Sequence, residues 1–205
     1  DHRFEEAFVA GRGPELEAAC ARAALLDAAE LPTSTWISLN FAPETIISGL
    51  ARQVVLEAER PIVIEVTEHS VIENYEALRA ALRDIPNVKV AVDDAGSGYT
   101  SLHHIVQLRP DYVKMDITLI RDIDHDPIRQ AMVAGLCYFA GATGCAIIAE
   151  GIERIEEADV LRNLGVTLGQ SNLLGQGYLF GRPAPLHHSD GWRTPALMLN
   201  SGDES

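Results

Sequence analysis

The stretch Val90-Ala91-Val92-Asp93-Asp94 joins a short apolar run to two adjacent carboxylates. Short runs rich in Val and Ile are typical of strands that are buried on both faces of a parallel sheet. Four more runs of this kind also end in an acidic or amide side chain: Ile37-Ser38-Leu39-Asn40, Ile62-Val63-Ile64-Glu65, Val113-Lys114-Met115-Asp116 and Ile147-Ile148-Ala149-Glu150. Because the parallel strands of a sheet or barrel end at one rim, we expect these polar side chains to meet there.

The strand ends would bring one amide and five carboxylates into a small volume: Asn40, Glu65, Asp93, Asp94, Asp116 and Glu150. Like charges this close together need cations or protonation. Oxygen ligands without Cys or His favour hard divalent ions such as Mg²⁺, Mn²⁺ or Ca²⁺ over zinc. A single acid at a strand end is more often a helix cap or a turn residue, but five such strands in series are hard to explain as caps.

Helical and strand patterns alternate along the chain, which indicates parallel strands joined by helical crossovers. The predicted strands are Trp36–Asn40, Pro61–Val66, Val88–Asp94, Tyr112–Asp116, Ala146–Glu150 and Val166–Gln170. The predicted helices are Glu15–Leu31, Pro43–Glu59, Tyr75–Leu82, Ser101–Leu108, Pro127–Ala142 and Ile155–Leu164. This order predicts an α/β fold, either a TIM-like (β/α) barrel or a doubly wound sheet, and the polar strand ends favour the barrel.

A closed barrel of this type needs eight strands, whereas the sequence shows six and opens in a helical region around Phe4 to Ala10. We therefore expect the first two strands to be absent from this chain. Six strands left open would expose two sheet edges, so something else should cover those edges in the intact molecule. We expect one domain over residues 1–186 and a C-terminal tail over residues 187–205.

Composition narrows the class of protein. The chain has 205 residues, of which 47% are hydrophobic, and a formal net charge of −14. This length supports one sizeable core, and the acidic balance without a cluster of Lys and Arg argues against duplex nucleic acid as a partner. No apolar stretch reaches the ~20 residues that span a bilayer, so no membrane segment is expected. The three cysteines, Cys20, Cys137 and Cys145, lie in apolar surroundings and indicate buried free thiols and a cytoplasmic location.

Six motifs follow one another in a specific order: Ser38-Leu39-Asn40, Glu65-Val66-Thr67-Glu68, the stretch from Asp93 to Leu102, Lys114-Met115-Asp116, Ala149-Glu150-Gly151-Ile152-Glu153 and the stretch from Gln176 to Pro183. Together they resemble the EAL-domain family, bacterial phosphodiesterases that linearise cyclic di-GMP. The resemblance extends from about Phe4 to Pro185. It implies metal-dependent hydrolysis of cyclic di-GMP to linear pGpG by two-metal activation of water, in bacterial second-messenger signalling.

The resemblance also implies a set of metal ligands. Asn40, Glu65 and Asp93 look like ligands of one Mg²⁺ or Mn²⁺ ion. Asp93, Asp94 and Glu150 look like ligands of a second, so Asp93 would bridge the two ions. Two ions about 3.5–4 Å apart lower the pKa of a water between them and stabilise in-line attack on phosphorus.

Further roles around the metals follow from the same resemblance. Lys114 would orient the water or stabilise charge on the phosphate, and Glu150 would act as general base, as metal ligand or as both. Asp116 shares a strand face with Lys114 and is either another metal ligand or a salt-bridge partner of Lys114. Glu68 resembles the family glutamate that holds the loop of residues 94–101 in place.

The expected substrate-site residues are Glu153, Gln170 and Gln176. The family has one glutamine just before Gly-Tyr, whereas this chain has two nearly identical Leu-Gly-Gln segments that end at Gln170 and Gln176. Spacing from Glu150 favours Gln170 as the residue that ends the sixth strand, and local motif context favours Gln176. We expect Gln170 to lie beside Glu150 and Gln176 to lie beyond a surface loop.

The Glu-Ala-Leu segment that gives the family its name is absent, and Glu6-Ala7-Phe8 lies in a helical stretch rather than on a strand. We therefore expect this chain to lack one ligand of the first metal and part of the nucleotide pocket, and to be weakly active or inactive by itself. An upstream sensory or regulatory domain is an expected partner, and a homodimer is an option.

Two other classes of function stay open. A catalytically silent module of the same fold could bind cyclic di-GMP or another protein, although such a module has little reason to keep all the strand-end ligands. An unrelated barrel metalloenzyme could instead abstract a proton beside a carboxylate, with Lys114 as base and Glu65, Asp93 and Glu150 around magnesium. The glycine-rich stretch after Asp93 and the ending from Gly177 to Pro183 favour the EAL-type interpretation.

Overall fold

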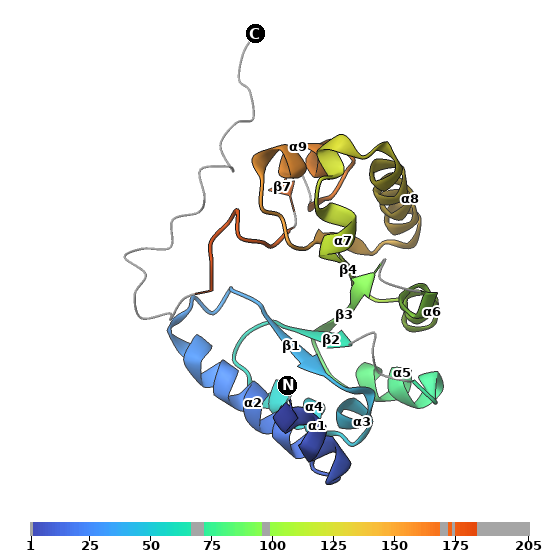
Figure 1. Cartoon of the computed structure of the whole chain (residues 1–205). Helices are drawn as coiled ribbons and strands as arrows, with labels where there is room; N and C mark the ends of the chain where they lie inside the picture. Colours follow the sequence, from blue (N-terminus) through green and yellow to red (C-terminus); the bar gives the residue numbers. More distant parts are fainter. Residues whose placement is uncertain (1, 67–71, 96–98, 169–171, 174, 184–205) are drawn as a thin grey trace.

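The computed structural model describes residues 2–66, 72–95, 99–168, 172–173 and 175–183, and the main sheet is built from five parallel strands. These strands are β1 (Ile37–Phe41), β2 (Ile62–Val66), β3 (Val88–Ala95), β4 (Tyr112–Met115) and β5 (Ala146–Ala149). Their order in the sheet is β1-β2-β3-β4-β5, so strands that are consecutive in sequence are also neighbours (Figure 1). This is the α/β arrangement of a TIM-like barrel and confirms the predicted fold class.

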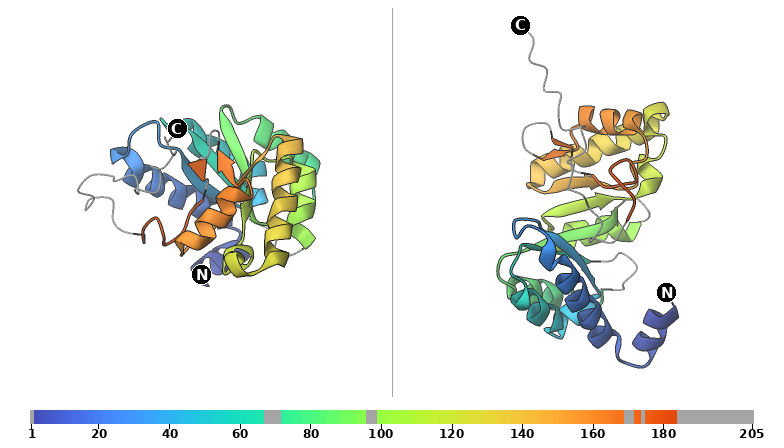
Figure 2. Two further views of the ribbon diagram at one scale, coloured as in Figure 1. Left: turned by 90° about the horizontal axis from the view of Figure 1, so that it is seen from above. Right: turned by 90° about the vertical axis from the view of Figure 1, so that its left-hand side faces the viewer.

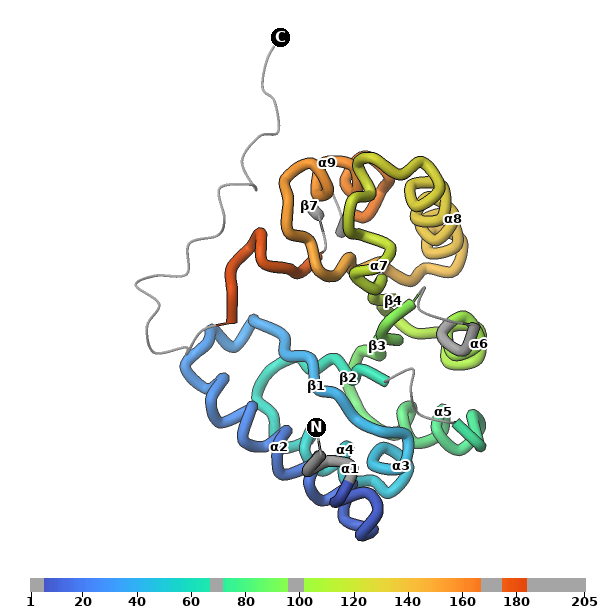
Figure 3. Tube along the Cα trace, viewed as in Figure 1, coloured from blue at the N-terminus to red at the C-terminus, as the bar shows by residue number. Residues whose placement is uncertain are grey.

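Helices connect the strands and surround the sheet, as the view from above in Figure 2 shows. They are α1 (His2–Val9), α2 (Gly13–Asp27), α3 (Pro43–Ile47), α4 (Leu50–Glu57), α5 (Tyr75–Arg83), α6 (Tyr99–Leu108), α7 (Ile117–Ile120), α8 (Pro127–Thr143) and α9 (Ile155–Asn163), with short 3₁₀ helices at Ala28–Glu30 and Ile123–His125. Figure 3 traces the chain from β4 through α7 into α8.

Local sequence sets several helix limits. The side chain of Asn74 accepts a hydrogen bond from the N–H of Ala77 and begins α5, and Asp126 caps α8 in the same way. Gly144, with φ +81°, ends α8 in the left-handed conformation that glycine adopts readily. The single helix predicted over residues 43–59 is divided into α3 and α4, because Gly49 has φ +83°.

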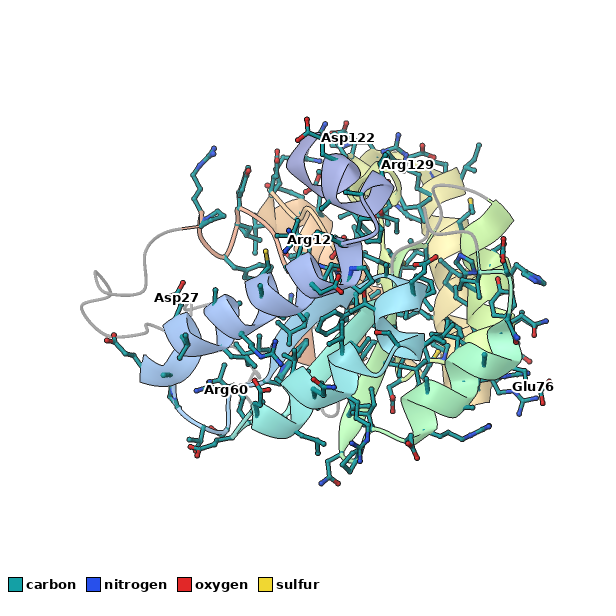
Figure 4. All side chains as sticks on the ribbon, turned by 90° about the horizontal axis from the view of Figure 1, so that it is seen from below. Arg12, Asp27, Arg60, Glu76, Asp122 and Arg129 are labelled. Atoms are coloured by element: carbon teal, nitrogen blue, oxygen red, sulfur yellow. The ribbon has the colours of Figure 1, made fainter. Side chains whose placement is uncertain are left out.

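The core lies between the outer face of the sheet and the helices. Large side chains that are buried there include Phe41, Ile64, Leu78, Met115 and Leu161. Side chains alternate between the two faces of a strand, so the neighbours of the strand residues Phe41, Ile64 and Met115 face the inside of the curved sheet. Charged side chains such as Asp27 and Glu76 point outward from the helical layer (Figure 4).

The prediction of a sixth parallel strand over Val166–Gln170 is wrong for the residues that the structure describes in this range. Residues Thr167–Leu168 (β6) pair antiparallel with Asn172–Leu173 (β7) in a separate two-stranded sheet. The edge of β5 is instead contacted by Gly175, which forms a parallel bridge with Ala149.

The cysteines differ in part from expectation. All three are free thiols, but Cys20 is exposed, whereas Cys137 and Cys145 are half-buried. Burial raises the pKa of the Cys137 thiol, which makes it a poor nucleophile. Among the described helices, none combines the length and apolarity that crossing a bilayer requires. The predicted tail of residues 187–205 lies outside the described residues.

Candidate functional site

Lys114 of β4 lies at the centre of a carboxylate cluster at the rim of the sheet. Its Nζ atom is 2.8 Å from Oε2 of Glu65, 2.9 Å from Oδ1 of Asp93 and 2.7 Å from Oε1 of Glu150. These three acids come from the ends of β2, β3 and β5. All four side chains were expected at this rim from the sequence, and the structure brings them together.

Burial removes these charged side chains from water and therefore shifts their pKa values. Glu65 and Lys114 are each only 5% exposed. Burial by itself would lower the pKa of Lys114, but hydrogen bonds to Glu150 and Glu65 outweigh it and hold the pKa well above its usual range. For Glu150, burial raises the pKa, hydrogen bonding to Lys114 lowers it, and the net shift is upward. Lys114 is therefore an ammonium group, which disfavours the role of a proton-abstracting base.

A bulge in β3 explains how two consecutive aspartates can serve one site. Residues that follow one another on a regular strand point to opposite faces. In β3 the pairing with β4 shifts between Val92 and Ala95, so that the strand has one extra residue there. Asp94 has φ +53°, and its backbone N–H donates to Oδ1 of Asp93 at 3.0 Å. The bulge lets Asp93 and Asp94 lie on the same side of the sheet.

The acidic side chains of Asp93, Asp94 and Glu150 form a group that could hold a metal ion. Each offers a carboxylate oxygen, and these atoms all lie within 4.8 Å of one another. Together with Glu65 they are four carboxylates around the single positive charge of Lys114. Oxygen-only donors with excess negative charge match hard divalent cations. The residues present therefore fit a divalent metal.

Asn40 lies beside this group rather than within it. It is the fourth residue of β1 and is exposed, and its Cα pairs in register with that of Glu65 in β2. Side chains in register on neighbouring parallel strands share a face of the sheet. Asn40 is therefore on the same face as Glu65, next to the cluster.

Asp116 caps helix α7 and does not form the salt bridge with Lys114 that was one alternative for it. Its carboxylate accepts hydrogen bonds from the N–H of Thr118, at 2.8 Å, and from the Thr118 hydroxyl. It is thus the N-cap of α7. Of the two alternatives for Asp116, the salt bridge with Lys114 is not formed, since the ion-pair partners of Lys114 among the described residues are Glu65, Asp93 and Glu150. A role of Asp116 as metal ligand stays a prediction.

Gln176 contacts the cluster directly. Its Nε2 atom donates to Oε1 of Glu150, and its backbone N–H donates to the carbonyl of Ala149 at 2.8 Å. The expectation that Gln176 would lie beyond a surface loop is therefore wrong, since residues 175–176 occupy the edge of β5. Gln170 and Glu68 lie outside the described residues.

A pocket of about 740 Å³ adjoins the cluster. The site residues Asp94, Asp116, Glu150, Glu153 and Gln176 line it, and so do Arg121 and Tyr178. This volume lies within the range of ligand pockets. Glu153 is 3.7 Å from Arg121 in an exposed ion pair, which places this predicted substrate-site residue at the pocket.

Two pocket residues were missed by sequence reasoning. Arg121 follows α7, and Tyr178 belongs to the motif from Gln176 to Pro183. Tyr178 is 52% exposed, and the guanidinium carbon of Arg182 lies 4.3 Å from its ring centroid. An exposed aromatic ring two residues after a predicted site glutamine was the signal that could have identified Tyr178.

Comparison with known proteins defines the class. The family model of the EAL domain matches residues 9–183, so the chain belongs to the EAL domain family. It is 32% identical over 158 residues to the cyclic di-GMP phosphodiesterase PdeR of Escherichia coli, an alignment that covers 75% of this chain and 23% of PdeR. It is 28% identical over 158 residues to the cyclic di-GMP phosphodiesterase PdeA of Borreliella burgdorferi, covering 73% of this chain and 23% of that protein. The chain thus spans about a quarter of the length of these relatives.

Solved structures show the same fold. Klebsiella pneumoniae BlrP1, in a complex with manganese and cyclic di-GMP at pH 6, matches with a TM-score of 0.73 and 30% identity, over 87% of this chain and 47% of that one. A calcium and cyclic di-GMP complex of the same protein gives a TM-score of 0.72 and 30% identity, over 85% and 45%. A standalone EAL protein of Vibrio cholerae with bound cyclic di-GMP gives 0.68 and 27%, over 82% and 73%.

Proposed function

We propose that this chain carries the catalytic site of a phosphodiesterase that hydrolyses cyclic di-GMP to linear pGpG with the help of two divalent metal ions. The observation that carries the proposal is the ammonium of Lys114 within 2.9 Å of three strand-end carboxylates, beside a pocket of about 740 Å³. Relatives named as cyclic di-GMP phosphodiesterases, and neighbours solved with cyclic di-GMP and a divalent metal, support the substrate.

The metal site would use the ligands that the strands bring to the rim. Asn40, Glu65 and Asp93 would hold one ion, and Asp93, Asp94 and Glu150 would hold the other. The oxygen-only donor set favours Mg²⁺ or Mn²⁺. Bound ions of this kind lower the pKa of an attacking water and offset charge on the phosphate.

Lys114 and Glu150 would act on the water and the phosphate. The ammonium of Lys114 can orient the water and stabilise negative charge that develops on a phosphate oxygen. Oε1 of Glu150 already accepts hydrogen bonds from Lys114 and Gln176. Oε2 is therefore the oxygen that can take the proton from the water.

The neighbouring pocket would hold the nucleotide. Arg121 supplies a guanidinium that can pair with a phosphate, in competition with Glu153. The exposed ring of Tyr178 offers a surface on which a guanine base can stack. Glu153 and Gln176 are the acceptor and donor groups available to the base edges or the ribose.

The setting of this activity is part of the proposal. Free cysteines suit a reducing compartment, so the cytoplasm is the proposed location. An upstream sensory or regulatory domain and a homodimer are the proposed partners, because the chain spans only about a quarter of the length of the curated relatives.

The test is to incubate the purified protein with cyclic di-GMP and either MnCl₂ or MgCl₂ and to follow pGpG by chromatography. We expect product from the intact protein and little or none from this chain alone. Any product should disappear with EDTA and return when excess metal is added. Isothermal titration with cyclic di-GMP and Ca²⁺ measures binding independently of turnover. It distinguishes the enzyme from a catalytically silent module, which would bind the ligand but not hydrolyse it with any metal. Absence of both binding and turnover would contradict the assignment of this substrate.

A further inference from the structure

The helices cover the outer face of the sheet unevenly. Val88 and Val90 of β3 pair in register with Ile62 and Ile64 of β2. The two isoleucines are 2% and 0% exposed, as expected for a strand beneath a helical layer. Val88 and Val90 are only half-buried. The helices that flank β3 therefore leave a gap over the first half of this strand.

That gap is a pocket of about 640 Å³. Its apolar lining consists of Leu82, Ile85, Val88, Val90 and Leu108, from the end of α5, the strand β3 and the end of α6. Its charged lining consists of Glu76, Arg79, Arg83 and Arg109. Glu76 projects from the outer side of α5 (Figure 4). The pocket thus combines an apolar floor with a mostly basic rim.

The rim of this pocket is positively charged, whereas the protein as a whole is acidic. The chain has a formal net charge of −14, yet three guanidinium groups and one carboxylate line the pocket. Arg79 donates to the carbonyl of Gln107 at 3.1 Å, which links α5 to α6. Arg83 and Arg109 have no ion-pair partner among the described residues. Two guanidinium groups are therefore available to an anionic ligand.

A purely structural role accounts for part of this arrangement. Arg83 lies in the last turn of α5, where a positive charge complements the helix dipole. That interaction does not explain why Arg109, the residue after α6, lines the same pocket, or why the pocket residues Val88 and Val90 stay half-buried. A bound molecule would cover the valines and neutralise the rim at the same time.

We propose that this pocket binds a small organic anion with an apolar or aromatic body and a carboxylate, sulfonate or phosphate head group. Guanidinium groups pair with such head groups through charge-assisted hydrogen bonds, and an apolar floor with a few convergent polar groups is typical of small-ligand sites. The site is separate from the carboxylate cluster. Val88 begins β3 and Asp93 lies near its end, about 16 Å away at ~3.3 Å per residue.

The probe for this proposal is 8-anilinonaphthalene-1-sulfonate, which has an aromatic body and one sulfonate. Titration of the folded protein should show a saturable rise in fluorescence with one probe per chain. In the double variant R83Q/R109Q the dissociation constant should rise at least about tenfold, since both charge-assisted hydrogen bonds are lost. The matched control R12Q removes an exposed arginine far from the pocket and should bind the probe like the unmodified protein.

A second measurement locates the probe without relying on affinity alone. Backbone amide shifts in two-dimensional NMR should move at Val88, Val90 and Leu108 on titration, and should stay in place at Asp93 and Glu150. Far-UV circular dichroism checks that each variant is folded. Equal affinity in R83Q/R109Q and R12Q, non-saturable binding, or shifts confined to other surfaces would each overturn the proposal. None of these readouts depends on phosphodiesterase activity.

Discussion

The Nε2 atom of Gln176 donates a hydrogen bond to Oε1 of Glu150, although the two residues are 26 positions apart in sequence. The same oxygen is 2.7 Å from Nζ of Lys114. The backbone of Gln176 is itself held by Ala149, the residue before Glu150. Gln176 is therefore a positioning residue, because it fixes the orientation of a carboxylate in the candidate metal group.

Replacing Gln176 with Ala should lower Mn²⁺ affinity or turnover by about ten- to a hundred-fold, the usual effect of losing a hydrogen bond that orients a metal ligand. Calorimetric titration with Mn²⁺ and the rate of pGpG formation measure the two quantities. Gln53→Ala, at an exposed position of α4, is the matched control and should change neither. An unaltered Gln176→Ala protein would show that the contact with Glu150 has no part in the site.

Asp93→Asn should reduce turnover by more than tenfold, which corresponds to ~1.4 kcal/mol in the activation barrier. Asp93 belongs to the carboxylate group and contacts Lys114, so the neutral amide weakens both the metal site and the position of the ammonium. Steady-state kinetics at saturating Mn²⁺ provide the measurement. Asp159→Asn, which alters an exposed carboxylate of α9, should leave the rate unchanged. Retention of more than a tenth of the activity would contradict a bridging role.

Lys114→Met should destabilise the metal-free protein by about 3–5 kcal/mol, because the buried carboxylate of Glu65 loses its partner among other negative charges. Urea unfolding in EDTA measures this loss. Adding Glu65→Gln to the same protein should recover part of it, since the uncompensated charge is then removed.

The matched control for that experiment is Lys89→Met. Lys89 is 2.7 Å from Asp111, but the two side chains are 57% and 37% exposed. Solvent screens such a pair, so the expected loss is below ~1 kcal/mol. If Lys89→Met and Lys114→Met lost similar amounts of unfolding free energy, burial would not be what makes the ion pairs of Lys114 strong.

Much of this fold was predictable because its strands are short apolar runs, of which β2 is buried throughout and β4 and β5 are buried at three of four residues. The apolar runs that end in Glu65, Asp93 and Glu150 mark their strands with an error of one or two residues. The convergence of their carboxylates follows from parallel strand order alone. Burial can be predicted from the apolar residues of a short segment, and strand direction from the alternation of strands and helices.

Features that depend on hydrogen-bond register were not predictable. The alternation of side chains does not reveal the extra residue of β3 that lets Asp93 and Asp94 share a site. Counting residues from Glu150 selected Gln170, because an antiparallel pair of short strands between β5 and Gln176 leaves no periodic signal. Asp116 lines the pocket as a site residue would, but its second role as the N-cap of α7 was not predicted, because a carboxylate after a strand can serve either purpose.

Acidification should reduce stability through Glu157, which is 2% exposed. Burial alone would raise its pKa, but the N–H groups of Asp122, Glu153 and Arg154 donate to the carboxylate and hold the pKa below its usual value of 4.5. Because the folded-state pKa is lowered, the stabilisation is present above the unfolded-state pKa and is lost as the pH falls through the folded-state value.

Urea unfolding between pH 3 and 7 tests this linkage, since ~3–7 brackets the titration of an ordinary glutamate. Glu157→Gln should unfold more easily at pH 7 and should lose stability less steeply below the usual glutamate pKa than the unmodified protein. The adjacent and exposed Glu156→Gln is the control and should keep the steep profile. Parallel profiles for all three proteins would exclude Glu157 as a source of acid sensitivity.

Gly177→Ala should displace Gln176 from Glu150. Gly177 has φ +155°, and a Cβ atom there would lie 2.2 Å from the carbonyl oxygen of Ile152 and 2.3 Å from its nitrogen. Backbone atoms cannot yield as a flexible side chain can, so the segment that carries Gln176 must move. We expect a loss of at least ~1 kcal/mol in unfolding free energy and the same reduction in Mn²⁺ affinity as in Gln176→Ala.

The control is Gly135→Ala in α8. A Cβ atom at position 135 would have no atom within 4 Å, so this change should instead stabilise the protein by up to ~1 kcal/mol. If Gly177→Ala kept both stability and metal affinity, the close approach of Gly177 to Ile152 would not be what holds Gln176 at the site.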